Sequence, residues 1–352
     1  MRQFPPEFSQ KMLDWYDENR RHLPWREEPS PYRTWISEVM LQQTRVEAGI
    51  AYFERFTDAL PDIASLAAAD EQQLLKLWEG LGYYSRVRNL KKAAGIVMEQ
   101  YGGNLPADFD ALCKLPGLGE YSAGAIASIA FDIRVPAVDG NVLRVAARIL
   151  GDDRNIEDPA VKKEFRCTVW KALPHNRVGD FNQSLMELGA LICLPNGRPL
   201  CECCPMAETC EAKKTGSQLL LPTRIKKNAR RTEQKTVLLL RRGAEVLICQ
   251  RPAKGLLASL WEFPCLAGDL TAAEVAQIYS LPGTAVTPLG KATHIFTHIL
   301  WEMEGYMVQL GQDAPIPQGC LSVLPQELLA GYPIPSAYAA YLKVLREEMQ
   351  NS

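Results

Sequence analysis

The chain contains 352 residues, 47% of them hydrophobic and 23% charged, with 39 basic and 41 acidic side chains. This length predicts two or three domains, and the ordinary content of 24 glycines and 24 prolines excludes a collagen-like or low-complexity protein. No apolar run approaches the roughly 20 residues of a membrane helix, and the first residues lack the apolar segment of a signal peptide. We therefore expect a soluble cytoplasmic protein with no membrane partner, and a monomer by default.

Up to about residue 214 the sequence predicts helix after helix. Apolar residues recur at helical spacing over residues 8–16, 32–44 and 87–98, and the last of these helices is expected to stop at Gly102-Gly103. No strand alternation of useful length precedes residue 235. Further helical patterns surround Ala111, Ala125, Val145 and Leu188.

The pattern then changes to strands. Residues 236–240 and 245–249 are predicted to form a hairpin, residues 297–308 another strand, and the residues after Pro335-Ser336 a final helix. We predict an all-α domain over 1–214, a basic linker over 215–234 and a smaller α+β domain over 235–352. Between Glu211 and Arg242 there are ten basic residues and two acidic ones, a bias equally typical of a solvated linker and of a nucleic-acid contact.

Cysteine is concentrated in one short loop. Cys193, Cys201, Cys204 and Cys210 are separated by seven, two and five residues, with Cys203 as a fifth thiol among them. In a cytoplasmic chain such crowding indicates a metal site more often than disulfides, but spacing alone does not separate zinc from an iron–sulfur cluster. The other cysteines are predicted to be reduced core residues: Cys113, Cys167, Cys249, Cys265 and Cys320.

A glycine-containing turn and an aspartate follow one another in the middle of the helical region. Gly117 and Gly119 lie in the turn LPGLG between two helical patterns, where backbone N–H groups suit a phosphate or a bridging cation. A plain interhelical turn is the alternative. Asp139 begins the next helix, either as an ordinary N-cap or as a carboxylate beside whatever the turn binds.

Glu38 is a second unusual carboxylate because it interrupts the apolar segment WISEVML. A buried acid must be paired or protonated, and burial would raise its pKa from about 4.3 toward about 6, as a general acid requires. The residues alone leave open a structural glutamate paired with an arginine such as Arg26.

Five segments in this order resemble one family over nearly the whole chain: PYRTWISEVMLQQTRV, LWEGLGYYSRVRNLKKAA, LPGLGEYSAGAI, AVDGNVLRVAAR and the cysteine loop. They resemble the MutY family of adenine DNA glycosylases, within the helix-hairpin-helix glycosylase superfamily. The resemblance implies a six-helix barrel with the helix-hairpin-helix at about 108–131. It also implies a module, made of the N-terminal helix and residues 135–214, that holds a [4Fe–4S] cluster on the four cysteines.

One departure from the family pattern concerns the cysteines. The gap after Cys193 is seven residues, where six is commonest in the family, and Cys203 supplies a spare thiol. Cys203 is therefore an alternative ligand within the loop.

Endonuclease III-type enzymes are the alternative, since they share the cluster, the hairpin and the aspartate. They attack the sugar with a lysine at the position that Tyr121 occupies here. A phenol cannot form the Schiff base of a strand-cleaving lyase, so the sequence favours a monofunctional glycosylase that uses water.

The chemistry of adenine removal assigns opposite roles to the two carboxyl groups. Once the base has been flipped out of the stack, protonated Glu38 supplies a proton at adenine N7. Ionised Asp139 stabilises the positive charge left on the sugar, and Asn141 orients either Asp139 or the water. By resemblance, Trp25, Arg26, Leu41 and Gln183 surround the adenine, Tyr121 lines the pocket, and Gln43 and Tyr83 enter the DNA stack. Tyr83 as a core aromatic is the alternative.

The C-terminal domain resembles the Nudix fold of 8-oxo-dGTP hydrolases. Between Leu266 and Ala285 only Asp269 and Glu274 are acidic, so pyrophosphatase activity should be absent. Residues Phe296-Thr297-His298 resemble the family loop that reads 8-oxoguanine opposite the adenine, with Thr297 where serine is common. A strand edge with incidental histidines is the alternative.

Three functions therefore compete. The leading one is removal of adenine mispaired with 8-oxoguanine or guanine in double-stranded DNA, during base excision repair. A bifunctional glycosylase/lyase is opposed by Tyr121. A non-catalytic iron–sulfur protein that binds DNA or transfers electrons would leave Glu38 and Asp139 unexplained.

Overall fold

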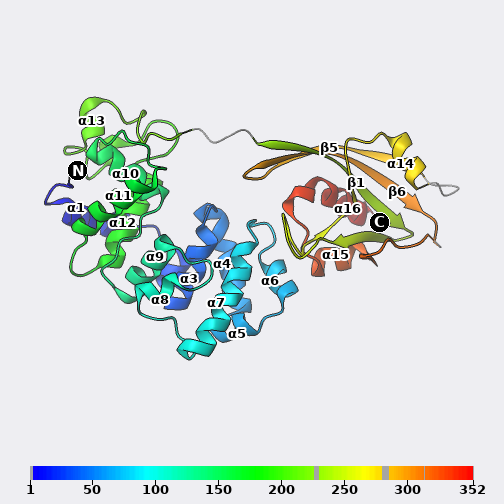
Figure 1. Cartoon of the computed structure of the whole chain (residues 1–352), viewed down its shortest axis with the longest axis horizontal. Coiled ribbons are helices and arrows are strands. Elements are labelled where there is room, and N and C mark those ends of the chain that lie inside the picture. Colours follow the sequence, from blue (N-terminus) through cyan, green and yellow to red (C-terminus); the bar gives the residue numbers. More distant parts are fainter. Residues whose placement is uncertain (1–2, 226–229, 280–284, 313, 352) are drawn as a thin grey trace. The chain divides into compact units, whose positions relative to one another are not determined.

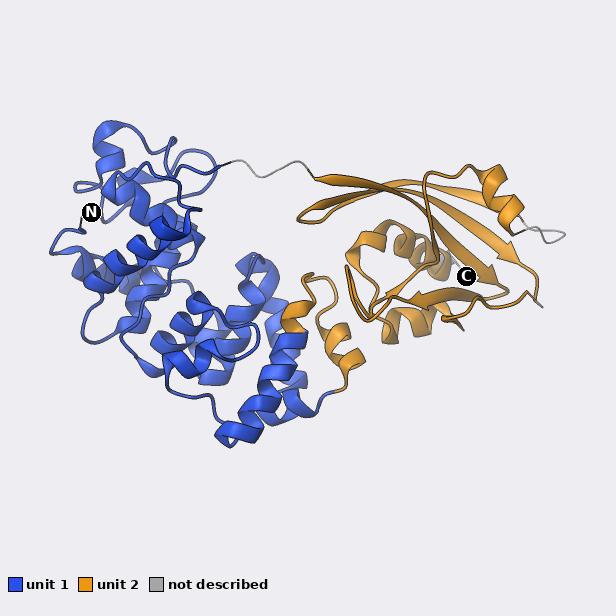
Figure 2. Cartoon of the chain, in the orientation of Figure 1, with its two compact units in different colours: residues 1–69, 88–226 blue, residues 70–87, 227–352 orange. Residues whose placement is uncertain are grey.

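The computed structural model describes residues 3–225, 230–279, 285–312 and 314–351 (Figure 1). It separates into two compact units (Figure 2). One unit comprises residues 1–69 and 88–226, and the other comprises residues 70–87 and 227–352. The second unit thus includes an early segment of the chain. Residues 226–229 of the expected linker lie outside the described residues, and the predicted domain boundaries stay a prediction.

The first unit is helical, as expected. None of the described helices is long and apolar enough to cross a membrane. The helical elements outside residues 70–84 and before residue 226 are α1 Phe8–Asn19, α2 Pro24–Glu27, α3 Pro31–Leu41, α4 Val46–Ala59, α5 Ile63–Ala68, α7 Ser85–Tyr101, α8 Phe109–Cys113, α9 Glu120–Phe131, α10 Gly140–Leu150, α11 Pro159–Ala172, α12 Val178–Leu191, the 3₁₀ turn η1 Cys201–Cys203 and α13 Glu211–Thr215.

The apolar face predicted for the first helix is confirmed. Phe8, Met12 and Tyr16 of α1 are almost completely buried and share a core cluster with residues of α10 and α12. The Phe8 ring meets Phe181 of α12 edge to face at 5.8 Å between centroids, a favoured aromatic arrangement. Helix α1 therefore packs on α10, whose N-cap is Asp139, and on α12, which ends at Leu191 just before the cysteine loop.

The second predicted helix ends earlier than expected. Helix α3 stops at Leu41 and not at residue 44. Gln43 has a φ of 60°, which an α-helix does not tolerate, and a turn between Leu41 and Thr44 replaces the expected last helical residues. The backbone at Gln43 is thus bent away from the helix, and the Gln43 side chain is exposed.

The second unit contains a mixed sheet of seven strands within the described residues, with the order β3-β2-β1-β6-β5, while β4 pairs with β1 and β7 with β2. Strands β1 and β6 are parallel, and the other pairs are antiparallel. The strands are β1 Arg231–Arg242, β2 Glu245–Gln250, β3 Trp261–Glu262, β4 Cys265–Ala267, β5 Val286–Ile295, β6 Ile299–Leu310 and β7 Cys320–Val323.

The apolar run of the predicted first strand reflects burial on both faces of the sheet. Val237 and Leu239 belong to one core cluster, and Leu238 and Leu240 belong to another. The hairpin between β1 and β2 is confirmed, with Arg242 opposite Glu245. Strand β1 begins at Arg231, inside the segment expected to be linker, because it pairs along its whole length with β6.

Helices complete the second unit on both sides of its sheet. The cluster on the Val237 side includes Tyr338 and Tyr341, whereas the cluster on the Leu238 side includes Val275 of α14. These helical elements are α14 Ala272–Ile278, α15 Pro325–Gly331, η2 Ser336–Tyr338 and α16 Ala339–Asn351.

The early segment of the second unit contains helix α6 Glu71–Leu77, which is tied to its late residues by hydrogen bonds. The Lys76 ammonium donates to the carbonyl oxygens of Leu329 at 2.8 Å and Tyr332 at 3.3 Å. Gln72 accepts from the Trp261 indole at 3.1 Å, and Glu79 accepts from the Ile334 amide at 2.8 Å.

The prediction that the scattered cysteines are reduced core residues is wrong for three of them. Cys249 and Cys320 form a disulfide, because antiparallel pairing of β2 with β7 places them opposite each other with Cα atoms 4.0 Å apart. They are 71 residues apart in the sequence, so spacing gave no sign of the pair. Cys167 is free but exposed.

Candidate active site

One cavity in the helical unit is lined by residues from seven helices (α1, α2, α3, α4, α9, α10 and α12) and from the adjoining loops. Glu38 comes from α3, Tyr121 from α9, and Asp139 and Asn141 from the start of α10. The remaining pocket residues expected from the sequence also line it: Trp25, Arg26, Leu41 and Gln183. The fold therefore brings together residues that are distant in the sequence.

Glu38 is partly buried in this cavity and is bonded to a phenol, not to a cation. The Tyr121 hydroxyl donates to Oε2 of Glu38 at 3.0 Å. Burial raises the pKa of Glu38 to about 7, with the Asp139 charge adding to the rise, while the Tyr121 hydrogen bond and the Arg26 charge oppose it. The rise expected from the sequence is confirmed in direction. A group with this pKa is protonated in a large fraction of molecules near neutral pH.

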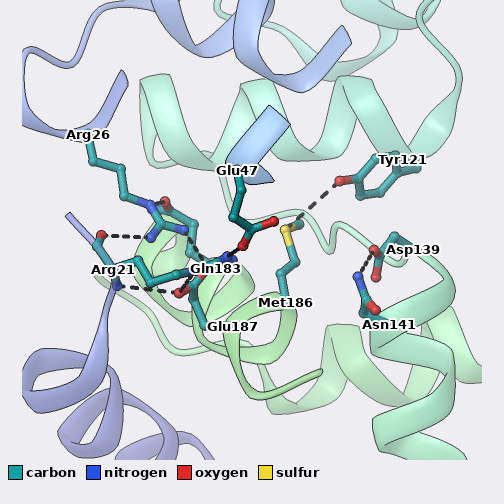
Figure 3. Close-up of polar contacts among 9 residues, drawn as sticks. All are labelled: Arg21, Arg26, Glu47, Tyr121, Asp139, Asn141, Gln183, Met186 and Glu187. Carbon is teal, nitrogen blue, oxygen red and sulfur yellow. Dashed lines mark hydrogen bonds and ion pairs between the residues drawn. The ribbon is translucent and has the colours of Figure 1, made fainter. Parts of the chain in front are cut away.

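Asp139 is the N-cap of α10, as the sequence predicted. Its Oδ1 accepts from the Val142 amide at 2.7 Å, and its Oδ2 accepts from the Asn141 side-chain amide at 2.8 Å (Figure 3). Burial raises the pKa of Asp139, and both of these hydrogen bonds oppose the rise. Since each oxygen faces an N–H donor, the arrangement suits the ionised carboxylate.

Asn141 also links Asp139 to the cysteine loop. The Arg144 guanidinium donates to the Asn141 side-chain oxygen at 2.8 Å and to the Cys193 carbonyl oxygen at 2.8 Å. Gly189 of α12 packs so closely on Asn141 that a Cβ at position 189 would lie 2.7 Å from the Asn141 Cβ. The orientation of the Asp139 partner is thus fixed from two sides.

The sequence left open an ion pair between Glu38 and Arg26, but the Arg26 side chain is bonded to other residues. It donates to Oε1 of Gln183 at 2.7 Å and to Oε1 of Glu187 at 3.2 Å (Figure 3). The Arg21 guanidinium adds two hydrogen bonds to Glu187, at 2.9 and 2.8 Å, and the Arg21 backbone N–H adds a third at 3.4 Å. Although burial opposes it, these two arginines hold the pKa of Glu187 below its ordinary value. The buried carboxylate of Glu187 thus holds Arg26, and through it Gln183, at the wall of the cavity.

Sequence reasoning missed several lining residues, among them Arg21, Met186 and Glu187. Glu187 carried a usable signal, because it interrupts the apolar pattern of its helix in the same way that Glu38 does. Gln183, Met186 and Glu187 also recur at the three- and four-residue spacing of one helical face. Arg21 precedes α2 without a comparable signal.

A second cleft shares Tyr121 and Asp139 with this cavity. Exposed Gln43 lines this cleft. Of the two hairpin glycines, Gly117 has a φ of 81°, whereas Gly119 has a φ of −88° and is the N-cap of α9. A positive φ is therefore confirmed only at Gly117.

Tyr83 and the predicted loop meet in the second unit. The Tyr83 hydroxyl and the Thr297 hydroxyl are 3.0 Å apart in a hydrogen bond. Tyr83 is 46% exposed, which excludes its alternative interpretation as a core aromatic. Thr297 and His298 are exposed in the turn between β5 and β6, whereas Phe296 is partly buried against Trp301 at 4.8 Å between ring centroids.

The four cysteines of the predicted cluster line one further cavity of the helical unit: Cys193, Cys201, Cys204 and Cys210. Arg148 donates to the Cys193 sulfur at 3.2 Å. Cys203 is exposed. Across the described ranges, no group of three or more His, Cys, Asp or Glu side chains is arranged to hold a metal ion.

The helical fold and its carboxylate-lined cavity define the class of the protein. Residues 36–171 match the HhH-GPD superfamily of base excision DNA repair proteins, and residues 236–344 match the NUDIX domain family. The helical region is also similar to a thermostable thymine-DNA glycosylase, with 28% identity and a TM-score of 0.54 over 59% of this chain and 95% of that one. A non-covalent endonuclease III–DNA complex gives 25% identity and a TM-score of 0.51, over 59% of this chain and 94% of that one.

A relative from Rattus norvegicus, adenine DNA glycosylase, is 35% identical over 88% of this chain and 71% of its own length. The chain belongs to the adenine DNA glycosylase family, with a helix-hairpin-helix glycosylase domain followed by a Nudix-like domain.

Proposed function

We propose that this chain removes adenine mispaired with 8-oxoguanine or guanine from double-stranded DNA, as a monofunctional glycosylase in base excision repair. The observation that carries the proposal is the pair of carboxyl groups in one cavity, with Glu38 biased toward its protonated form and Asp139 held by N–H donors. Family membership supports adenine as the base.

Adenine leaves slowly as an anion, so protonation of its ring is the first requirement. Glu38, with a pKa of about 7, donates a proton to N7 of the flipped base. Trp25 and Leu41 provide apolar surface for the base, and Arg26 and Gln183 provide polar contacts at the same wall. Because burial raises its pKa, Glu38 already carries this proton in a large fraction of molecules near neutral pH before the base arrives.

Departure of the base leaves positive charge on the sugar, which ionised Asp139 stabilises. The Val142 amide and Asn141 hold both of its oxygens in place before the reaction begins. Tyr121 lies in the cavity where a lyase needs an amine, and its phenol cannot form a Schiff base. A water molecule therefore completes the reaction and leaves an abasic site.

The opposite base is read by the second unit in this proposal. Tyr83 and Thr297 present an exposed, hydrogen-bonded pair of hydroxyl groups, with His298 exposed beside them. Hydroxyl and imidazole groups can distinguish the N7–H and O8 of 8-oxoguanine from the bare N7 of guanine. Gln43, exposed at the bend after α3, enters the stack at the position of the flipped adenine.

Cys193, Cys201, Cys204 and Cys210 would hold a [4Fe–4S] cluster, which would cross-link the loop and support α10 when bound. Their four thiols line one cavity, and four cysteine ligands are the set that a [4Fe–4S] cluster takes. Gly117 and Gly119 would offer backbone groups to a DNA phosphate or to a bridging monovalent or divalent cation.

The decisive experiment uses a labelled duplex with adenine opposite 8-oxoguanine, resolved before and after heating in alkali. We expect intact strands that break only after alkali, and no adduct on borohydride reduction. Glu38→Gln should abolish adenine release while duplex binding survives, and Asp139→Asn should be comparably damaging. Strand cleavage without alkali, together with a trapped covalent adduct, would instead establish the bifunctional glycosylase/lyase.

A further inference from the structure

Helix α11 presents an exposed face of cations around a single aromatic ring. Lys163, Arg166, Cys167 and Trp170 recur at the spacing of one helical face, while Phe165 and Val169 are completely buried on the other. The Trp170 side chain is 48% exposed, and the Arg134 guanidinium lies 4.9 Å from its ring centroid. Cations interleaved with an exposed aromatic ring are typical of nucleic-acid surfaces.

This face lines the cleft that is also lined by Tyr121 and Asp139, the two residues that line the catalytic cavity as well. Lys163, Trp170 and Lys171 of α11 line it together with Tyr121 and Asp139. A DNA strand whose flipped nucleotide enters the cavity through this opening must therefore continue past α11.

The cleft carries more positive than negative side chains. Three carboxylates line it, and two of them are already paired: Glu157 with Lys162 at 2.9 Å and Glu120 with Arg166. In the described part of the chain, Lys163 and Lys171 form no ion pair, so both ammonium groups are free for a ligand. The excess of unpaired positive charge suits the binding of a polyanion such as DNA.

The face is also continuous with the predicted phosphate-binding turn. Arg166 of α11 contacts both helices that flank this turn, through the Phe109 ring of α8 at 5.3 Å and through Glu120 of α9. Helix α11 is therefore fixed in position relative to Gly117 and Gly119. Phosphates beyond those held by the turn would meet the lysines of α11.

We propose that the exposed face of α11, formed by Lys163, Arg166, Trp170 and Lys171, binds the phosphate backbone of the DNA strand that carries the flipped nucleotide. This inference rests on the proposed function and extends it by a second backbone-binding surface. Lys163 and Lys171 each neutralise a phosphate, and Trp170 packs against the sugar or a base beside it.

The test compares the full chain with Lys163→Gln/Lys171→Gln in equilibrium binding to an adenine:8-oxoguanine duplex from low to high salt. Two lost phosphate contacts should lower the slope of log K against log salt by about 2 and weaken binding by about tenfold at 0.1 M salt. Single-turnover adenine release at subsaturating protein should slow in parallel with the weaker binding, because the lysines act on binding and not on the reacting atoms.

The matched control is Lys11→Gln/Lys343→Gln, which removes the same charge from α1 and α16, where Lys11 and Lys343 pair with Glu7 and Glu347. An unchanged salt slope in the α11 variant, or an equal loss in the control, would overturn the inference. That result is distinct from failure of the proposed function, which would appear as absence of adenine release by the unaltered chain.

Discussion

The hydroxyl of Tyr121 on α9 donates a hydrogen bond of 3.0 Å to the carboxyl group of Glu38 on α3. Tyr121 occupies the position at which the alternative function requires a lysine, so the same residue that rules out the lyase nucleophile also contacts the proposed general acid, Glu38. The hydrogen bond lowers the pKa of Glu38 against the rise caused by burial.

Tyr121→Phe should therefore move the pH dependence of adenine release. Without the phenol, the pKa of Glu38 rises further, and the decline of the single-turnover rate on the alkaline side should shift to higher pH. The measurement is the rate on an adenine:8-oxoguanine duplex at saturating protein across pH 5–9. A variant whose rate drops uniformly without a shift would show that Tyr121 does not tune Glu38.

The unaltered chain should lose activity as pH rises through about 7, the pKa of Glu38. Above that pH only the protonated fraction of Glu38 transfers a proton, so the rate should fall about tenfold per pH unit. At low pH the rate should fall again as Asp139, whose pKa is also raised, becomes protonated. A rate that stays flat from pH 7 to 9 would contradict the role of Glu38 as acid.

Glu38→Gln should stabilise the fold in alkaline solution although it removes activity. The pKa of Glu38 is raised in the folded state, so its stability contribution is present below its unfolded pKa and is lost as pH rises toward 7. The neutral amide avoids this loss, and at pH 8 the free energy of unfolding should increase by up to about 3 kcal/mol. Denaturant titrations at pH 8 and pH 5 check this; an equal gain at both pH values would refute it.

Gly189→Ala should slow adenine release although it replaces no polar side chain. The added Cβ would lie 2.7 Å from the Asn141 Cβ and displace the side chain that binds Asp139. Loss of one buried hydrogen bond to a carboxylate is worth about 1–3 kcal/mol, or roughly tenfold to a hundredfold in rate. Gly95→Ala is the control, since a Cβ added at Gly95 would have no described atom of another residue within 4 Å beyond its own helix and chain neighbours. Equal rates for the two variants would exclude positioning through Asn141.

Lys76→Met should reduce discrimination between opposite bases. Lys76 lies in the same early segment as Tyr83, which is hydrogen-bonded to Thr297. The Lys76 ammonium donates to the carbonyl oxygens of Leu329 and Tyr332 and so ties this segment to the late residues of the second unit. Release of this segment should lower the ratio of single-turnover rates on adenine:8-oxoguanine and adenine:guanine, with less effect on the guanine mispair. Lys343→Met, on the exposed side of α16, is the control. Equal slowing of both mispairs would argue against a role in discrimination.

The sequence predicted best those features that depend on local periodicity. The buried face of α1, the N-cap at Asp139 and the hairpin at Gly243 follow from side-chain spacing and turn chemistry, and the structure confirms each. The cavity residues were found because Glu38 breaks an apolar pattern and because resemblance linked it to Asp139. Their roles in the reaction stay predictions.

Features that depend on pairing between distant segments could not be predicted from spacing. The disulfide between Cys249 and Cys320 requires the register of β2 against β7, and the start of β1 at Arg231 requires its partner β6. The end of α3 at Leu41 depends on the positive φ of Gln43. Glutamine has a high helix propensity, so the sequence gives no sign that the helix ends there.

The assignment of Asp70–Val87 to the second unit has a consequence for biosynthesis. The acceptors of the Lys76 ammonium are 253 and 256 residues further along the chain, and the amide that Glu79 binds is 255 residues further along. A ribosome therefore delivers this segment long before its partners exist, and its contacts form only when almost the whole chain has been translated. Truncated translation products that end before Leu329 would lack the acceptors of Lys76 and the amide that Glu79 binds, so the early segment would be without these tertiary contacts.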